Sequence, residues 1–155
     1  MPHMFDSLGV TKRQVAVGAA VLGVGCAIGF GTHLTYVDRA LEIRPDDNIV
    51  LHMRGRWSFS VAQLSWIERK VAATLFASPP NATVEDALAD FLEAERVKPG
   101  EWIENLVYVA KCYLALNDQT SAMPYLRTAL SGLEVTDPGD QAALEEARLL
   151  MKSIT

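Results

Sequence analysis

The sequence predicts an all-α fold, a short solenoid of helical repeats that follows one N-terminal transmembrane helix. Apolar residues after Thr35 recur at helical spacing, and no alternating run is long enough to suggest a sheet. A pattern of small and large residues in this part of the chain returns after 35 residues, which is typical of a repeat protein. The segment from Val15 to Thr32 carries no charge over eighteen residues, as a transmembrane helix requires.

Residues 15–34 are expected to anchor the chain in a membrane, behind a tail of residues 1–14 and ahead of a helical domain of residues 35–155. At a rise of about 1.5 Å per residue, the apolar stretch covers about 27 Å, enough for the core of a bilayer. An uncleaved anchor is favoured over a signal peptide because no A-x-A site follows. Small residues recur at every fourth position, and they either form a smooth face for a second transmembrane helix or only lower the helix propensity. They are Ala19, Gly23, Ala27 and Gly31.

The repeated pattern in the helical domain is that of tetratricopeptide units, which are helix–turn–helix elements of about 34 residues. Small residues allow the paired helices to cross closely, and large ones fill the space between neighbours. The recurring positions are Ala87, Phe91 and Ala94, followed 35 residues later by Ala122, Leu126 and Ala129. About two and a half units can be recognised, whereas stable arrays usually need at least three. Self-association is therefore an expected means of completing the stack.

Local signals place the ends of the predicted helices. Thr83 is expected to cap a helix that stops at Pro99-Gly100, and Asn117-Asp118 marks a tight turn. Pro138-Gly139 precedes a last helix, roughly Asp140 to Ser153. The stretch from Asn48 to Ser78 has no internal break, so it predicts either one long helix or two nearly abutting helices.

Composition excludes several classes of function. The net charge of −5 argues against a nucleic-acid binder, which would carry an overall basic balance. No enzyme signature is present, and the three histidines have no ligand at metal-binding spacing, so neither catalysis, a metal nor a cofactor is expected. Carboxylates are plentiful, but we expect them on exposed helix positions, where they form a solvated face. These are Glu85, Asp86, Asp90 and Glu93.

Charge is unevenly distributed along the helical domain. Residues 48–76 hold four basic residues and one acidic residue, a balance of +3, whereas residues 85–104 have a balance of −5. The basic residues are Arg54, Arg56, Arg69 and Lys70. On one reading they form a basic face that attracts an acidic protein tail, an anionic lipid headgroup or a peptide carboxylate. On the other, they pair with acids of the next repeat and hold the solenoid together. Both interpretations stay open.

Trp57 and Trp66 are the candidate aromatic residues of a binding groove. With Phe59, Phe76 and Trp102 they supply much of the large aromatic surface of the chain, and most of that surface is expected in the core between helices. A minority that lined a concave groove would hold a ligand together with the arginines.

Several segments resemble the regulator of microtubule dynamics family over about Val37 to Thr155. They are Arg54-Gly-Arg-Trp-Ser-Phe, Leu64-Ser-Trp-Ile-Glu-Arg-Lys, Phe91-Leu-Glu-Ala-Glu and Tyr108-Val-Ala-Lys-Cys-Tyr. The resemblance implies a non-enzymatic protein that associates with microtubules and the spindle. The basic face would then contact the acidic tails of tubulin.

The resemblance also implies a location. Some relatives have an N-terminal anchor, so the helical domain is expected in the cytoplasm at the mitochondrial outer membrane or the endoplasmic reticulum. A mitochondrial relative tethers these two organelles and binds phospholipid. The alternative function is therefore a phospholipid-binding or tethering module at such contact sites, with an anionic phospholipid as the partner.

Overall fold

The computed structural model describes residues 36–75, 81–132, 135 and 138–154 of the 155-residue chain. All regular secondary structure in this part is helical, which confirms the predicted all-α class. The expected anchor at residues 15–34, with the small residues Ala19, Gly23, Ala27 and Gly31, lies outside the described residues. None of the described helices is long and apolar enough to cross a membrane.

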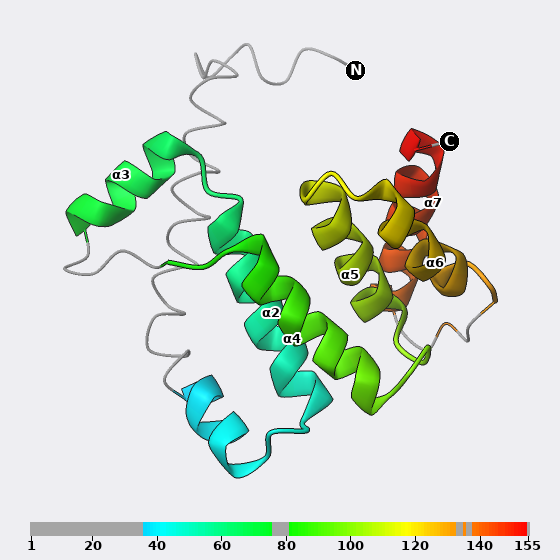
Figure 1. The fold of residues 1–155 in the computed structure, drawn as a ribbon, viewed down its shortest axis with the longest axis horizontal. Helices are drawn as coiled ribbons and strands as arrows, with labels where there is room; N and C mark the ends of the chain where they lie inside the picture. Colours follow the sequence, from blue (N-terminus) through cyan, green and yellow to red (C-terminus); the bar gives the residue numbers. More distant parts are fainter. Residues whose placement is uncertain (1–35, 76–80, 133–134, 136–137, 155) are drawn as a thin grey trace, which may run out of the picture.

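Seven helical segments follow one another along the described chain (Figure 1). The first covers residues 36–43. The others are α2 (Asn48–Ala62), α3 (Trp66–Leu75), α4 (Val84–Val97), α5 (Ile103–Ala115), α6 (Gln119–Ala129) and α7 (Pro138–Ile154). The stretch after Asn48 therefore forms two abutting helices, the second of the two predicted arrangements. The last helix begins two residues before the predicted start and ends one residue after the predicted end.

The predicted helix boundaries have identifiable local causes. Thr83 and Asp86 form a reciprocal cap at the start of α4: the Thr83 hydroxyl accepts from the Asp86 amide at 3.1 Å, and the Asp86 carboxylate accepts from the Thr83 amide at 3.0 Å. Between α5 and α6, Asn117 adopts the left-handed conformation with φ of 62°. The Asp118 side chain then caps α6 by accepting from the Ser121 amide at 3.0 Å. These contacts confirm the helix start and the tight turn.

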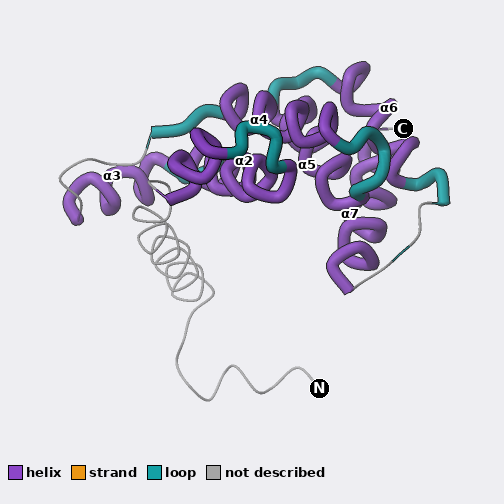
Figure 2. Tube along the Cα trace, turned by 90° about the horizontal axis from the view of Figure 1, so that it is seen from below, coloured by secondary structure: helices purple, strands orange, loops and turns teal. Residues whose placement is uncertain are grey.

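The helices other than α3 form a stack in which each helix packs on the next one along the chain. Helix α4 packs on α2 and α5, and α7 packs on both α5 and α6 (Figures 1 and 2). The core between them is apolar, and its largest fully buried side chains include Phe91, Ile103, Leu106 and Leu126. At the repeating positions, Ala87, Ala94, Ala122 and Ala129 are all buried, as the pattern of small residues predicts.

Gly55 allows α2 and α4 to approach each other closely. A Cβ atom at this position would lie 2.8 Å from Cε1 of Phe91, closer than real Cβ atoms come to another heavy atom. Phe91 is fully buried, so its ring has little room to move away. The glycine between Arg54 and Arg56 therefore has a packing role, and it brings these two arginines over the neighbouring helices.

Candidate functional site

Arg54 joins α2 to α4 through a buried carboxylate. Its guanidinium donates to Asp90 at 2.9 Å from Nε and 2.6 Å from Nη2, and to Asp38 at 3.3 Å from Nη1. Hydrogen bonds to Asp90 are the main reason that the pKa of Arg54 is raised above its usual value. The prediction that Asp90 is exposed is wrong, because Arg54 holds it against α2 and leaves it 8% exposed.

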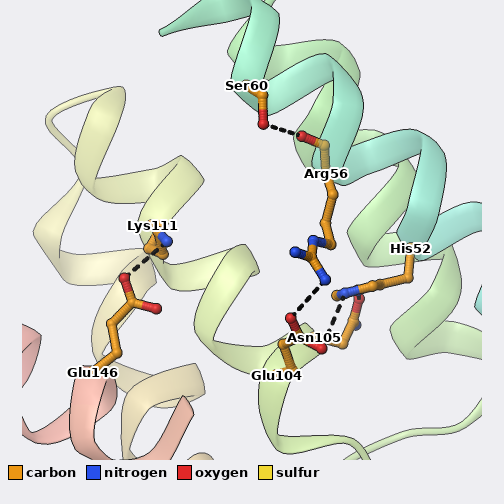
Figure 3. A network of polar contacts seen from close by, with 7 residues as sticks. All are labelled: His52, Arg56, Ser60, Glu104, Asn105, Lys111 and Glu146. Carbon is orange, nitrogen blue, oxygen red and sulfur yellow. Dashed lines mark hydrogen bonds and ion pairs between the residues drawn. The ribbon is translucent and has the colours of Figure 1, made fainter. Parts of the chain in front are cut away.

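Arg56 and Lys111 make two further ties between helices (Figure 3). Nη1 of Arg56 lies 3.0 Å from Glu104 on α5, and Nζ of Lys111 lies 2.8 Å from Glu146 on α7. Both cations also approach the ring of Tyr108, at 5.5 Å and 4.4 Å from its centroid. The structure therefore pairs Arg54 and Arg56 with acids of following helices, as the second interpretation of the basic residues expects.

His52 lies beside the Arg56–Glu104 ion pair (Figure 3) and was not identified as a notable residue from the sequence. Its Nδ1 is 2.9 Å from Oδ1 of Asn105 (Figure 3). The Asn105 amide nitrogen donates to the carbonyl of Phe91 at 3.0 Å, so its oxygen is the acceptor and His52 carries the proton on Nδ1. The spacing in the sequence could have shown that this histidine faces the neighbouring helices. His52 precedes Gly55 by three residues and Phe59 by seven, which places all three on one face of a helix.

Burial determines the charge of His52. It lowers the pKa of the imidazole to about 4, although the Asn105 hydrogen bond acts in the opposite direction. The side chain is therefore neutral near pH 7. The 3.7 Å separation between its Nε2 and Glu104 is not an ion pair at that pH. Aromatic rings surround it, with the Trp102 centroid at 4.1 Å and the Phe91 centroid at 5.2 Å.

Helix α3 differs from the rest of the stack. It packs against none of the other labelled helices, and it projects from one side of the stack in both views (Figures 1 and 2). Its start is stabilised locally: the Ser65 amide donates to the Glu68 carboxylate at 2.7 Å, and the Glu68 amide donates to the Ser65 hydroxyl at 3.4 Å. The start of this helix is therefore held by residues of its own segment.

Two of the predicted basic residues lie on α3 and keep an exposed positive charge. Arg69 donates to the backbone carbonyls of Leu64 at 3.1 Å and Ala62 at 2.9 Å, at the end of α2. Nζ of Lys70 lies 4.1 Å from the ring centroid of Trp66. Within the described part of the chain, neither cation has a carboxylate within ion-pair distance.

The two candidate tryptophans lie on different helices. Trp57 is half-buried in α2, where its Nε1 is buried. Trp66 is 68% exposed on α3, and the adjacent Ile67 is 67% exposed. Trp66 therefore belongs to the minority of large aromatic residues expected outside the core. The reason is that α3 has no partner among the labelled helices.

These features define an all-α protein of stacked helices, tied by ion pairs between helices, with one projecting helix that carries exposed cations and a tryptophan. The chain belongs to the family described as regulator of microtubule dynamics protein 1-3. The sequence model of this family matches residues 33–155.

Similar proteins carry that family name. Regulator of microtubule dynamics protein 2 of Rattus norvegicus is 36% identical over 84% of this chain and 31% of its own length. Regulator of microtubule dynamics protein 1 of Caenorhabditis elegans is 39% identical over 75% of this chain and 50% of its own. Regulator of microtubule dynamics protein 3 of Rattus norvegicus is 40% identical over 75% of this chain and 25% of its own. The chain thus spans between a quarter and a half of these relatives.

Proposed function

We propose that this chain is a non-enzymatic, tetratricopeptide-like binding module that acts on microtubules by holding the acidic tails of tubulin. The observation that carries the proposal is the exposed cationic pair on α3, Arg69 and Lys70, which no carboxylate neutralises in the described residues. Membership of the regulator of microtubule dynamics family supports microtubules as the partner. In the same proposal, residues 15–34 hold the module at a membrane, with the helices in the cytoplasm.

The structure changes which basic residues this mechanism would use. Arg54 and Arg56 already have carboxylate partners on other helices. Withdrawing Arg54 would leave the buried Asp90 without its partner. Arg69 and Lys70 contact carbonyls and a ring, neither of which cancels their charge. An acidic tail can therefore bind them without breaking an ion pair of the fold.

Co-sedimentation with microtubules tests the proposal. The full chain, kept in a mild non-ionic detergent, is compared with an Arg69→Glu/Lys70→Glu variant at about 50 mM and about 150 mM salt. We expect the parent to pellet less at the higher salt, and the variant to bind at least about ten-fold more weakly than the parent. Pelleting by the parent that does not change with salt would contradict the mechanism.

An Arg148→Glu/Lys152→Glu variant is the matched control. These two exposed basic residues lie on α7, on the opposite side of the stack from α3 (Figure 1). The change in net charge is the same as for the α3 variant, so a general charge effect would weaken both equally. We expect the control to pellet within about two-fold of the parent. Circular dichroism shows whether the helices survive in each variant.

A further inference from the structure

The exposed surface of α3 is apolar as well as basic. Trp66 and Ile67 are adjacent and each about two-thirds exposed, and Lys70 lies one turn further along the same helix. Burying apolar surface is worth about 25 cal/mol per Å², and a tryptophan offers more of it than any other side chain. A purely electrostatic contact with an acidic tail would leave this surface in water.

We infer that Trp66, Ile67 and Lys70 form a docking surface, the α3 surface, for an acidic peptide segment that carries an apolar side chain beside its carboxylates. This inference rests on the proposed function and deepens it, because it specifies the partner's chemistry at the same helix. A carboxylate of the peptide contacts the Lys70 ammonium, and the neighbouring apolar side chain packs on the indole and on Ile67.

The occupant is an acidic peptide because its carboxylates complement the exposed cations of α3, Arg69 and Lys70. The chain as a whole has a net charge of −5, and its acidic residues concentrate between Glu85 and Glu104, so the body of the protein repels an acidic partner. Helix α3 packs on none of the helices in that region. Because exposed charges are screened over about 8 Å at physiological salt, the cations of α3 act on a partner locally.

The contact between Lys70 and Trp66 prepares the surface for such a peptide. With Nζ 4.1 Å from the ring centroid, the ammonium lies over the face of the indole. Positive charge and aromatic surface are thus already together before a partner arrives. Tryptophan is among the residue types most enriched at the positions that dominate binding energy.

Besides its charge, Arg69 has a positioning role for this surface. Its guanidinium spans the carbonyls of Ala62 and Leu64, which links the side of α3 to the end of α2. Together with the Ser65–Glu68 cap, this link directs α3 away from the stack. A surface that is already held in place loses less freedom on binding, which strengthens the affinity.

Microtubule co-sedimentation of the full chain tests the apolar part of the surface. A Trp66→Ala/Ile67→Ala variant keeps both cations, and we expect it to bind at least about ten-fold more weakly than the parent. Leu149→Ala is the matched control, since Leu149 on α7 is 69% exposed, and it should bind like the parent. If the parent pellets with microtubules and the Trp66→Ala/Ile67→Ala variant pellets equally well, the inference is overturned.

Two labelled synthetic peptides separate this inference from the proposed function. One contains only glutamate, and the other has a phenylalanine in place of every third glutamate. The inference expects the parent to bind the second peptide more tightly, and the Trp66→Ala/Ile67→Ala variant to lose that preference. If this holds while the parent fails to pellet with microtubules, tubulin is not the partner and the α3 surface remains. No preference in the parent overturns the inference.

An Arg69→Lys variant tests the positioning role. Lysine keeps the charge but lacks the fork that reaches two carbonyls. We expect binding to the phenylalanine-containing peptide to weaken about three-fold or more, while its dependence on salt stays that of the parent. Unchanged affinity would contradict the positioning role of Arg69.

Discussion

His52 illustrates at the residue scale how a polar side chain is accommodated between the helices. It is 2% exposed, and its Nδ1 hydrogen bond to Asn105 is supported by the bond from Asn105 to the carbonyl of Phe91. Buried polar groups are stable only when they are paired, and here the pairing fixes one tautomer of the imidazole. The second ring nitrogen is also buried but makes no hydrogen bond to the described residues. The site therefore favours the neutral form.

The lowered pKa of His52 predicts a dependence of stability on pH. The unfolded chain protonates this residue near pH 6.5, whereas the folded chain does so only near pH 4. Between these values the unfolded state binds more protons, so the stability present above pH 6.5 decreases as the pH falls toward 4. The expected loss is about 3 kcal/mol in the free energy of unfolding.

Urea unfolding at several pH values, followed by circular dichroism, measures this loss. His52→Gln is the control, because glutamine does not titrate. Its stability is lower at neutral pH but should change little between pH 6.5 and 5, a range above the titration of ordinary carboxylates. If the variant lost stability across this range as steeply as the parent, His52 would not be the titrating group.

At the scale of elements, an ion pair between two helices and an ion pair within one helix contribute very differently to stability. Arg54 and Asp90 join α2 to α4 through two short hydrogen bonds, and Asp90 is nearly enclosed. Arg96 and Glu93 form an equally short pair at 2.7 Å, but both lie on the surface of α4. Exposed pairs contribute little, because water competes for both charges, whereas a buried carboxylate without its partner is costly.

Replacing Arg54 by alanine should therefore destabilise the fold far more than replacing Arg96. Arg54→Ala leaves the Asp90 carboxylate buried without its cation, with an expected cost of about 1–3 kcal/mol in the free energy of unfolding. Arg96→Ala removes only an exposed contact and should have a much smaller effect. Urea denaturation of both variants gives the comparison. Similar costs for the two would mean that the Arg54 pair is as well solvated as the surface pair.

On the scale of the whole molecule, the stack and α3 differ in what stabilises them. The helices α4 to α7 share apolar cores that include Phe91, Val109, Leu126 and Ala147. Helix α3 shares no core with the other labelled helices, and its described contacts are the local cap and the bonds from Arg69 to the end of α2. Segments with few buried contacts open at a lower free energy than the rest of a protein.

Limited digestion with trypsin should therefore cleave α3 before it cleaves the helices of the stack. Among cleavage sites in the described residues, we expect the first cuts after Arg69 or Lys70, because α3 can open without disturbing a core. Cuts after Lys111, which is in the middle of α5 and paired with Glu146, should come much later. Mass spectrometry of the early fragments identifies the order. Early cleavage at Lys111 would mean that the stack opens as readily as α3.

The sequence by itself determined the helical class, the family and most helix boundaries, because these depend on local features. Thr83, Pro99-Gly100 and Asn117-Asp118 act within a few residues of the ends they mark. The spacing of Ala87, Phe91 and Ala94 likewise reports which side of one helix is buried. The resemblance carried by the segments around Arg54 and Leu64 identified the family that matches residues 33–155.

The tertiary structure alone decided which basic residues remain available to a partner. Arg54 meets Asp90 across 36 positions, and Arg56 meets Glu104 across 48. Such pairings depend on how helices far apart in sequence cross, and no local pattern encodes them. Helix α3 stays outside that packing. Arg69 and Lys70 therefore form no ion pair with the described residues, and Trp66 stays exposed. In the sequence nothing distinguishes the four basic residues from one another. They differ in whether a carboxylate lies near them, because ion pairing depends on distance in space.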